Sequence, residues 1–155
     1  MSGIGAHILF VAVLLATAMV FALLEIQIEG RAGWAADLPA WRLKNRWTRT
    51  FLGARPLTGY HLYFQLFLLL LLHLPYGLSL LRPSVTAELR IIAFGLLFWI
   101  VEDFLWFVLN PDYGFHAFRR ERIPWHAQTW WWFMPRDYWI FLPIAIGAYV
   151  ASWMV

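Results

Sequence analysis

The stretch FWIVEDFLWF, residues 98–107, contains eight large apolar residues and, between them, the adjacent carboxylates Glu102 and Asp103. Its surroundings, residues 89–109, are apolar enough to sit in lipid. A membrane-spanning helix needs about 20 mostly apolar residues, so we expect one here. The two acids then require an explanation. Inserting an acidic side chain near the centre of such a helix costs roughly 2.5–3.5 kcal/mol of free energy, and acids in this position are functional by default.

The composition of the whole chain also indicates a membrane protein. Of its 155 residues, 62% are hydrophobic, and they include eleven Trp and thirteen Phe, whereas about half of the residues of a soluble domain are apolar. The chain has no Cys, which excludes disulfides, thiolate zinc sites and iron–sulfur clusters. Its basic residues lie beside apolar segments rather than on a soluble face, which argues against nucleic-acid binding.

Four apolar segments predict four membrane spans, at residues 4–28, 60–81, 89–109 and 138–155. The first is too long for a signal peptide core and lacks its basic flank, so we expect it to remain in the protein. Spans of this kind are helical, because lipid cannot hydrogen-bond an open backbone. The expected fold is therefore an all-α integral membrane protein, a four-transmembrane-helix bundle that forms a single membrane domain over residues 1–155.

The basic residues predict the orientation of this bundle. Ten of the twelve Arg and Lys residues lie in the two long connections, 30–59 and 110–137, and two lie in the short connection between the second and third spans. Loops rich in Arg and Lys stay in the cytoplasm. We therefore expect a multi-pass protein of the cytoplasmic (inner) membrane, with both long loops in the cytoplasm and both termini on the other side.

Each long connection has a distinctive segment. In WRLKNRWTRTFL, residues 41–52, a helix would place Leu43, Trp47 and Phe51 on one side, which is typical of an interfacial helix near anionic headgroups; the alternative is an ordinary basic flank. In IPWHAQTWWWFMPRDYW, residues 123–139, the Trp cluster predicts an aromatic belt or, alternatively, a re-entrant segment that covers a cavity.

Acids and histidines gather at the predicted cytoplasmic ends of the spans, where six of them fall: Glu25, Glu29, His61, Glu102, Asp103 and His126. Within the third span, helical spacing places Glu102 and Asp103 on one stripe with three further residues, Trp99, Trp106 and Asn110. This stripe should face the bundle rather than lipid. We expect one polar site that opens toward the cytoplasm. The structural alternative is an ion pair between these acids and a loop arginine, such as Arg31 or Arg136.

The donor types favour a metal-dependent enzyme that acts on a lipid-like or polyene hydrophobic substrate. Carboxylates and imidazoles are ligands for iron, manganese and zinc, and the candidate ligands here are Glu25, Glu29, Glu102, His126 and His61. Glu102 and Asp103 are the candidate catalytic residues, and the candidate substrate-binding residues are Trp99, Trp106, Trp130 and Tyr138. The chain lacks the Glu-x-x-His pair of di-iron bundles. Haem is not favoured.

Two other functions fit the same residues. A carboxyl group in an apolar cavity can act as a general acid, and Trp faces can stabilise a developing cation, so a metal-free isomerase or cyclase of a hydrophobic substrate is one alternative. A small ion- or proton-coupled transporter is the other, since ionisable residues in spans also mark ion pathways. Small-residue spacings such as Ala18-x-x-x-Ala22 allow close helix packing within one chain or in a homo-oligomer. Membrane lipids are the expected surroundings.

Overall fold

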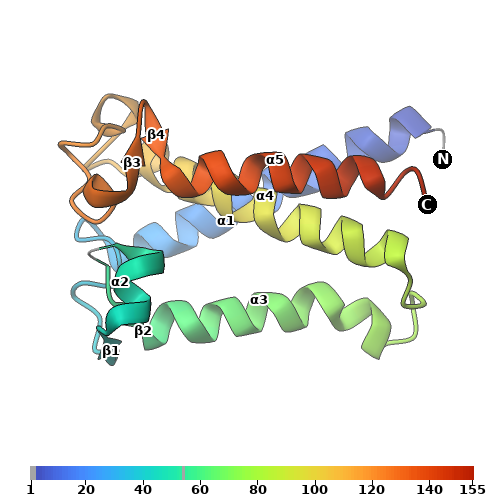
Figure 1. The fold of residues 1–155 in the computed structure, drawn as a ribbon, viewed down its shortest axis with the longest axis horizontal. Coiled ribbons are helices and arrows are strands. Elements are labelled where there is room, and N and C mark those ends of the chain that lie inside the picture. The colour runs from blue at the N-terminus through green and yellow to red at the C-terminus, as the bar shows by residue number, and fades with distance from the viewer. Residues whose placement is uncertain (1–2, 54) are drawn as a thin grey trace.

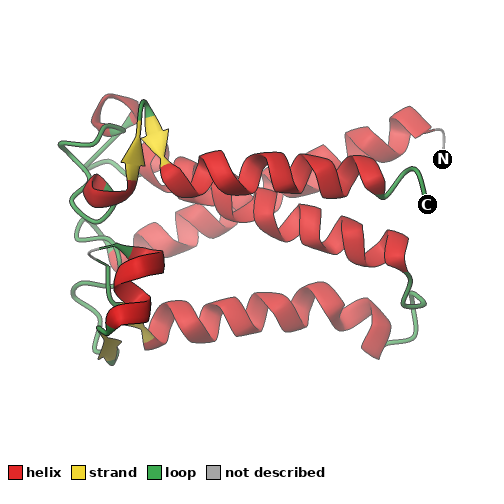
Figure 2. Cartoon of the chain, viewed as in Figure 1, coloured by secondary structure: helices red, strands yellow, loops and turns green. Residues whose placement is uncertain are grey.

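The computed structural model describes residues 3–53 and 55–155 and is mainly helical (Figure 2). Five α-helices make up most of the described residues: α1 (Gly3–Glu29), α2 (Arg46–Leu52), α3 (Gly59–Gly77), α4 (Val85–Leu109) and α5 (Arg136–Ala151). Two short 3-10 helices, η1 (Phe115–Ala117) and η2 (Ala127–Thr129), lie between α4 and α5. Two antiparallel pairs of two-residue strands complete the fold: β1 (Arg42–Leu43) with β2 (Leu57–Thr58), and β3 (Trp130–Trp131) with β4 (Met134–Pro135).

The four long helices run along the long axis of the molecule, and α2 and the four strands gather at one end, which we call the loop end (Figure 1). Both termini and the connection between α3 and α4 lie at the opposite end (Figure 1). Helix α4 packs mainly against α1 and α5 and approaches α3 less closely. The acidic residues of α4, Glu102 and Asp103, therefore lie between the other long helices, close to the loop end.

Two helices, α1 and α4, are long and apolar enough to cross a membrane among the residues the structure describes. The other two expected spans are shorter: α3 has 19 residues with Pro75 inside it, and α5 has 16 with Pro143 inside it. At a rise of about 1.5 Å per residue, a helix of α5's length reaches roughly 24 Å, less than the ~30 Å hydrocarbon core of a bilayer.

Small side chains and caps explain how the long helices begin and pack. Ala18 and Ala22 are fully buried, so the small-residue spacing of α1 serves packing within this chain, as close helix approach requires. Thr58 caps the start of α3 by accepting a hydrogen bond from the His61 N–H, and Ser84 caps α4 in the same way through Ala87. These caps set where the polar residues of each helix fall.

The expected helix over residues 41–52 is shorter than its pattern predicts. Arg42 and Leu43 pair with β2, and the helix begins only at Arg46. Asn45 caps the N-terminus of this helix. The Asn45 side chain accepts a hydrogen bond from Thr48 N–H, and the Thr48 hydroxyl accepts one from Asn45 N–H. Leu43 therefore does not share a helix face with Trp47.

The ends of α1 and α4 are joined by side chains from the segment that follows α4. Asn110 is 1% exposed, and its amide donates to the Gly30 carbonyl at 3.1 Å. The Tyr113 hydroxyl donates to the Arg31 carbonyl at 2.9 Å. Burial, with the nearby carboxylates of Asp112 and Glu29, raises the pKa of Tyr113, so its hydroxyl stays protonated and remains a donor.

The turn after α1 makes a close contact that tests this packing. Gly30 and Gly33 have φ values of +62° and +61°, but a Cβ on Gly33 would lie 2.6 Å from Trp125, whereas one on Gly30 would have no atom within 4 Å. Gly33→Ala should therefore lower the free energy of unfolding by about 1–3 kcal/mol more than Gly30→Ala, which carries the same backbone strain without the clash. Denaturant unfolding in detergent measures the difference, and equal losses in the two variants would contradict the packing described.

Candidate functional site

A small cavity lies between α1, α3 and α4 at the loop end, and its lining contains most of the polar residues picked out from the sequence. Its volume is about 100 Å³, room for roughly three water molecules at ~30 Å³ each. We call it the acid cavity; it is lined by Glu25, Glu29, Trp34, His61, Gln65, Trp99, Glu102, Asp103, Trp106, Phe107 and Trp125.

Glu102 is the most enclosed acid of this cavity. Its side chain is only 2% exposed, and its Oε1 atom has no hydrogen-bond partner among the described residues. The Glu102 carboxyl group interacts directly with that of Glu25 across the α1–α4 interface. The indole N–H of Trp106, one helical turn further along α4, is likewise buried without a partner among those residues. Such groups normally have partners, and leaving one without costs about 1–3 kcal/mol.

Glu25 joins α1 to α3. It is 8% exposed and accepts a hydrogen bond from the Tyr60 hydroxyl at 3.0 Å. The Glu25 and Glu102 carboxyl groups thus form a buried pair with one side-chain donor, Tyr60, directed at it. Two adjacent carboxylates in apolar surroundings cannot both be ionised without a large cost, so the pair favours a shared proton.

Glu29 lines the cavity and also stabilises the turn after α1. Its Oε1 atom accepts a hydrogen bond from Ala35 N–H at 2.5 Å. This bond holds a tight turn in which Gly33, Trp34 and Ala35 all have left-handed backbone conformations. The same oxygen lies 3.8 Å from His61 Nε2, so Glu29 links the turn to the cavity.

His61 is oriented by its other nitrogen. Its Nδ1 lies 2.7 Å from the Thr58 hydroxyl, and its ring stacks on Trp34 with centroids 4.1 Å apart. These two contacts fix the imidazole so that Nε2 is directed toward Glu29. A histidine held in this way presents one nitrogen to the cavity, which suits either proton transfer or metal binding.

A second polar cluster, which we call the Asp103 cluster, lies beside the acid cavity. Tyr138 Oη donates to Asp103 Oδ2 at 2.5 Å, and His126 Nε2 lies 3.5 Å from Asp103 Oδ1. Arg55, 5% exposed, donates to Asp137 at 2.8 Å and lies 3.4 Å from His126 Nδ1. Because an arginine can only donate, His126 Nδ1 accepts and Nε2 carries the proton directed at Asp103.

The structure thus separates the predicted ligands into two groups. Glu25, Glu29, Glu102 and His61 meet around the acid cavity, whereas His126 contacts Asp103 and Arg55 instead. Among the described residues, no three acids or histidines are arranged closely enough to hold a metal ion. Neither Arg31 nor Arg136 forms an ion pair with the α4 acids in that part of the chain; Arg136 pairs with Asp137 at 3.0 Å. The two arginines that the sequence suggested therefore do not pair with these acids among the described residues.

The aromatic residues divide in a similar way. Trp99 and Trp106 line the acid cavity, as expected. Tyr138 belongs to the Asp103 cluster. Trp130 packs against Phe118, with ring centroids 5.3 Å apart, and lines an outer pocket with Trp131 and Trp139.

The site also contains residues that the sequence analysis did not name as candidates, among them Trp34, Tyr60, Arg55 and Trp125. Tyr60 stands next to His61 at the start of a predicted span, a signal that was available in the sequence. The places of Trp34, Arg55 and Trp125 depend on how the loops fold back, for which no local pattern exists.

Comparison of the chain with models of known protein families, with curated proteins and with solved structures gave no match. The function is therefore argued from the chemistry of the two clusters.

The adjacent acids of α4 should respond differently to loss of charge. Asp103→Asn should lower the free energy of unfolding by about 1–3 kcal/mol, because a charged acceptor for Tyr138 and His126 is lost. Glu102→Gln should leave it within about 0.5 kcal/mol of wild type or raise it, because one of its oxygens has no partner and it adjoins a second carboxyl group. Denaturant unfolding in detergent compares the two isosteric variants. If Glu102→Gln lowered the free energy of unfolding as much as Asp103→Asn, the different roles assigned to the two acids would be contradicted.

Proposed function

We propose that the chain crosses the membrane four times, through α1, α3, α4 and α5, with the loop end in the cytoplasm. Three observations support this topology. Two of the helices have the length and composition of spans. Both termini lie at the end opposite the loops (Figure 1). Large apolar side chains on the outer face of α3 are exposed, including Phe67, Leu70 and Leu74, as a lipid-facing surface requires. The shorter α5 is accommodated by local thinning of the bilayer.

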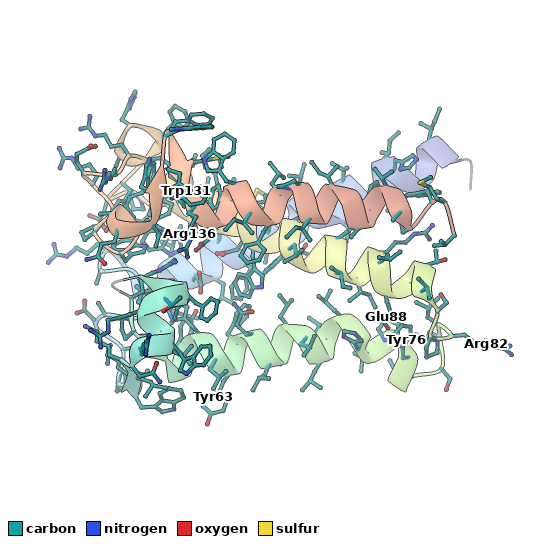
Figure 3. The ribbon with its side chains drawn as sticks, in the orientation of Figure 1. Tyr63, Tyr76, Arg82, Glu88, Trp131 and Arg136 are labelled. Atoms are coloured by element: carbon teal, nitrogen blue, oxygen red, sulfur yellow. The ribbon has the colours of Figure 1, made fainter. Side chains whose placement is uncertain are left out.

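The absence of native cysteine makes this topology directly testable. Arg46, Arg82 and Arg122 are all exposed, and Arg82 lies at the end opposite the loops (Figure 3). In intact cells, Arg82→Cys should react with a membrane-impermeant maleimide added outside, whereas Arg46→Cys and Arg122→Cys should react only after the membrane is opened. Labelling of all three from the same side would contradict the four-span topology.

We propose that the acid cavity is the active site of a membrane enzyme that transfers protons to and from a hydrophobic substrate. The observation that carries this proposal is the buried Glu102 carboxyl group, which has an oxygen without a partner among the described residues and adjoins Glu25. A carboxyl pair that shares a proton supplies a general acid, and Glu29 with His61 supplies acceptors nearby. The faces of Trp99 and Trp106 stabilise positive charge that develops on the substrate.

An apolar groove beside the cavity offers a place for the rest of the substrate. The cavity itself, at about 100 Å³, admits only a small reacting group. The groove has a volume of about 560 Å³ and is lined by Trp41, Tyr63, Phe64 and neighbouring residues, including Tyr60. Tyr63 points outward from α3 (Figure 3). Tyr60 forms part of the groove and also donates to Glu25 in the cavity, so a substrate in the groove lies next to the proton-sharing pair.

A metal-dependent reaction is the second candidate, favoured by the donor set. Four carboxyl groups and one imidazole ring line one cavity, and these donors suit iron, manganese or zinc. Against it stands the spacing of the donors among the described residues, which does not form a metal-binding group. Glu29 and His61 would have to move closer to Glu25 and Glu102 on binding.

Comparative lipid analysis tests the proposed enzyme. Membranes from cells that express wild type should contain a hydrophobic product that is absent with Glu102→Gln and Glu25→Gln. Glu88→Gln is the matched control, because Glu88 lies at the opposite end of α4, 3.4 Å from His73 (Figure 3). Identical lipid profiles for wild type and Glu102→Gln, with both proteins folded, would reject the acid cavity as an active site.

The mass of the product distinguishes the candidate chemistries. Proton transfer alone gives a product with the mass of the substrate, and in deuterated water it introduces deuterium. A metal-dependent oxidation instead adds oxygen or removes hydrogen, and purified wild type would contain stoichiometric iron, manganese or zinc that Glu102→Gln lacks. Ion or proton flux in liposomes, abolished by Glu102→Gln without any change in lipids, would favour the transporter.

A further inference from the structure

The loop end contains a second polar pocket that shares none of its lining residues with the acid cavity. Its volume is about 320 Å³, and it is lined by Lys44, Thr48, Arg49, Gly53, Arg55 and Gln128. This volume lies within the roughly 300–1,000 Å³ range of small-molecule sites. We call it the basic pocket.

The charge of the basic pocket is not neutralised within the described part of the chain. Three of its six lining residues are cations and none is acidic. Arg55 pairs with Asp137, but Lys44 and Arg49 form no ion pair with any described residue. The Gln128 side chain also has no hydrogen-bond partner there, so its amide is available as a further donor. These are the donors that an anionic oxygen group requires.

The backbone around the pocket is fixed by local interactions. The reciprocal bonds between Asn45 and Thr48 fix the start of α2, between Lys44 and Arg49. On the other side, Gly53 has a φ of +63°, and a Cβ there would lie 2.8 Å from Thr129. This close approach brings the end of α2 against η2, which carries Gln128. The described lining residues therefore come from two loops that lie in close contact.

The surroundings of the pocket indicate that its ligand belongs to a lipid. Trp47 and Phe51 project from α2 with exposed fractions of 72% and 60%, and their rings stack with centroids 6.1 Å apart. Exposed aromatic side chains beside cations are typical of the level of the lipid headgroups. A ligand that reaches the basic pocket from this level carries its charge in the headgroup region and its chains in the bilayer.

We propose that the basic pocket binds the phosphate group of an anionic membrane lipid, through Lys44, Arg49 and the Gln128 amide. An arginine guanidinium matches the geometry of phosphate oxygens in a bidentate way, and a lysine adds a compact charge. Basic residues near the cytoplasmic surface also attract anionic lipids by about 1 kcal/mol each. This inference rests on the proposed placement of the loop end at the cytoplasmic surface. It does not rest on the proposed enzymatic function, because none of these residues lines the acid cavity.

Thermal unfolding of the purified full-length protein in neutral detergent tests this site. Short-chain phosphatidic acid should raise the melting temperature in a saturable way, and the matching diacylglycerol should not. Lys44→Gln/Arg49→Gln should weaken the apparent affinity by about tenfold or more, the loss expected when hydrogen bonds to a charged group are removed. Arg46→Gln/Arg122→Gln is the matched control, since it removes the same charge from exposed positions outside the pocket, and it should bind as wild type does.

The outcomes of this experiment are distinct. Equal weakening in the two double variants would mean general charge attraction and would overturn the site. No saturable shift in wild type would overturn it as well. An equal shift with inorganic phosphate alone would assign the pocket to a soluble anion and overturn the lipid assignment. Unfolding curves without ligand check that both double variants keep the wild-type fold.

Discussion

A buried carboxyl group needs a hydrogen-bond donor or a proton, and this requirement governs the loop end of the molecule. Four acids of α1 and α4 lie among the helices near the loop end. Three of them accept hydrogen bonds from groups outside their own helices. Glu25 has Tyr60 from α3, Glu29 has the backbone of the turn after α1, and Asp103 has Tyr138 from α5. The fourth, Glu102, adjoins the Glu25 carboxyl group, and its Oε1 atom has no donor among the described residues. This incompletely satisfied group is the observation on which the proposed active site rests.

A buried arginine, Arg55, holds the two long loops together. Arg55 from the first loop contacts Asp137 and His126, which belong to the second loop and its junction with α5. Its guanidinium also lies over the Trp34 ring, 4.6 Å from the centroid. Because these contacts join segments far apart in sequence, they position the walls of the acid cavity. The loop end is therefore a folded cap on the bundle, and not a set of loose connections.

Local patterns predicted a useful part of this arrangement. The inward stripe of α4 follows from helical spacing, and burial confirms it: Glu102, Trp106 and Asn110 are 2%, 4% and 1% exposed. One cavity is lined by four of the predicted polar residues, Glu25, Glu29, Glu102 and His61. This follows from the sequence, because each of them lies near the same end of an apolar segment. The short helix α2 was only half predicted, since the apolar spacing suggested Leu43 as a member while the Asn45 cap excluded it.

The sequence by itself determined which residues are apolar, which helices they form and at which end the polar groups lie, because these depend on composition and on a period of 3.6 residues. Only the tertiary structure decided the partners. It placed His126 with Asp103 rather than with the other predicted ligands, and it stacked Trp34 on His61. It also paired Arg55 and Arg136 with Asp137 rather than with the acids of α4. Such choices depend on how two long loops close over the bundle, and loop closure is set by contacts between distant residues that no local period encodes.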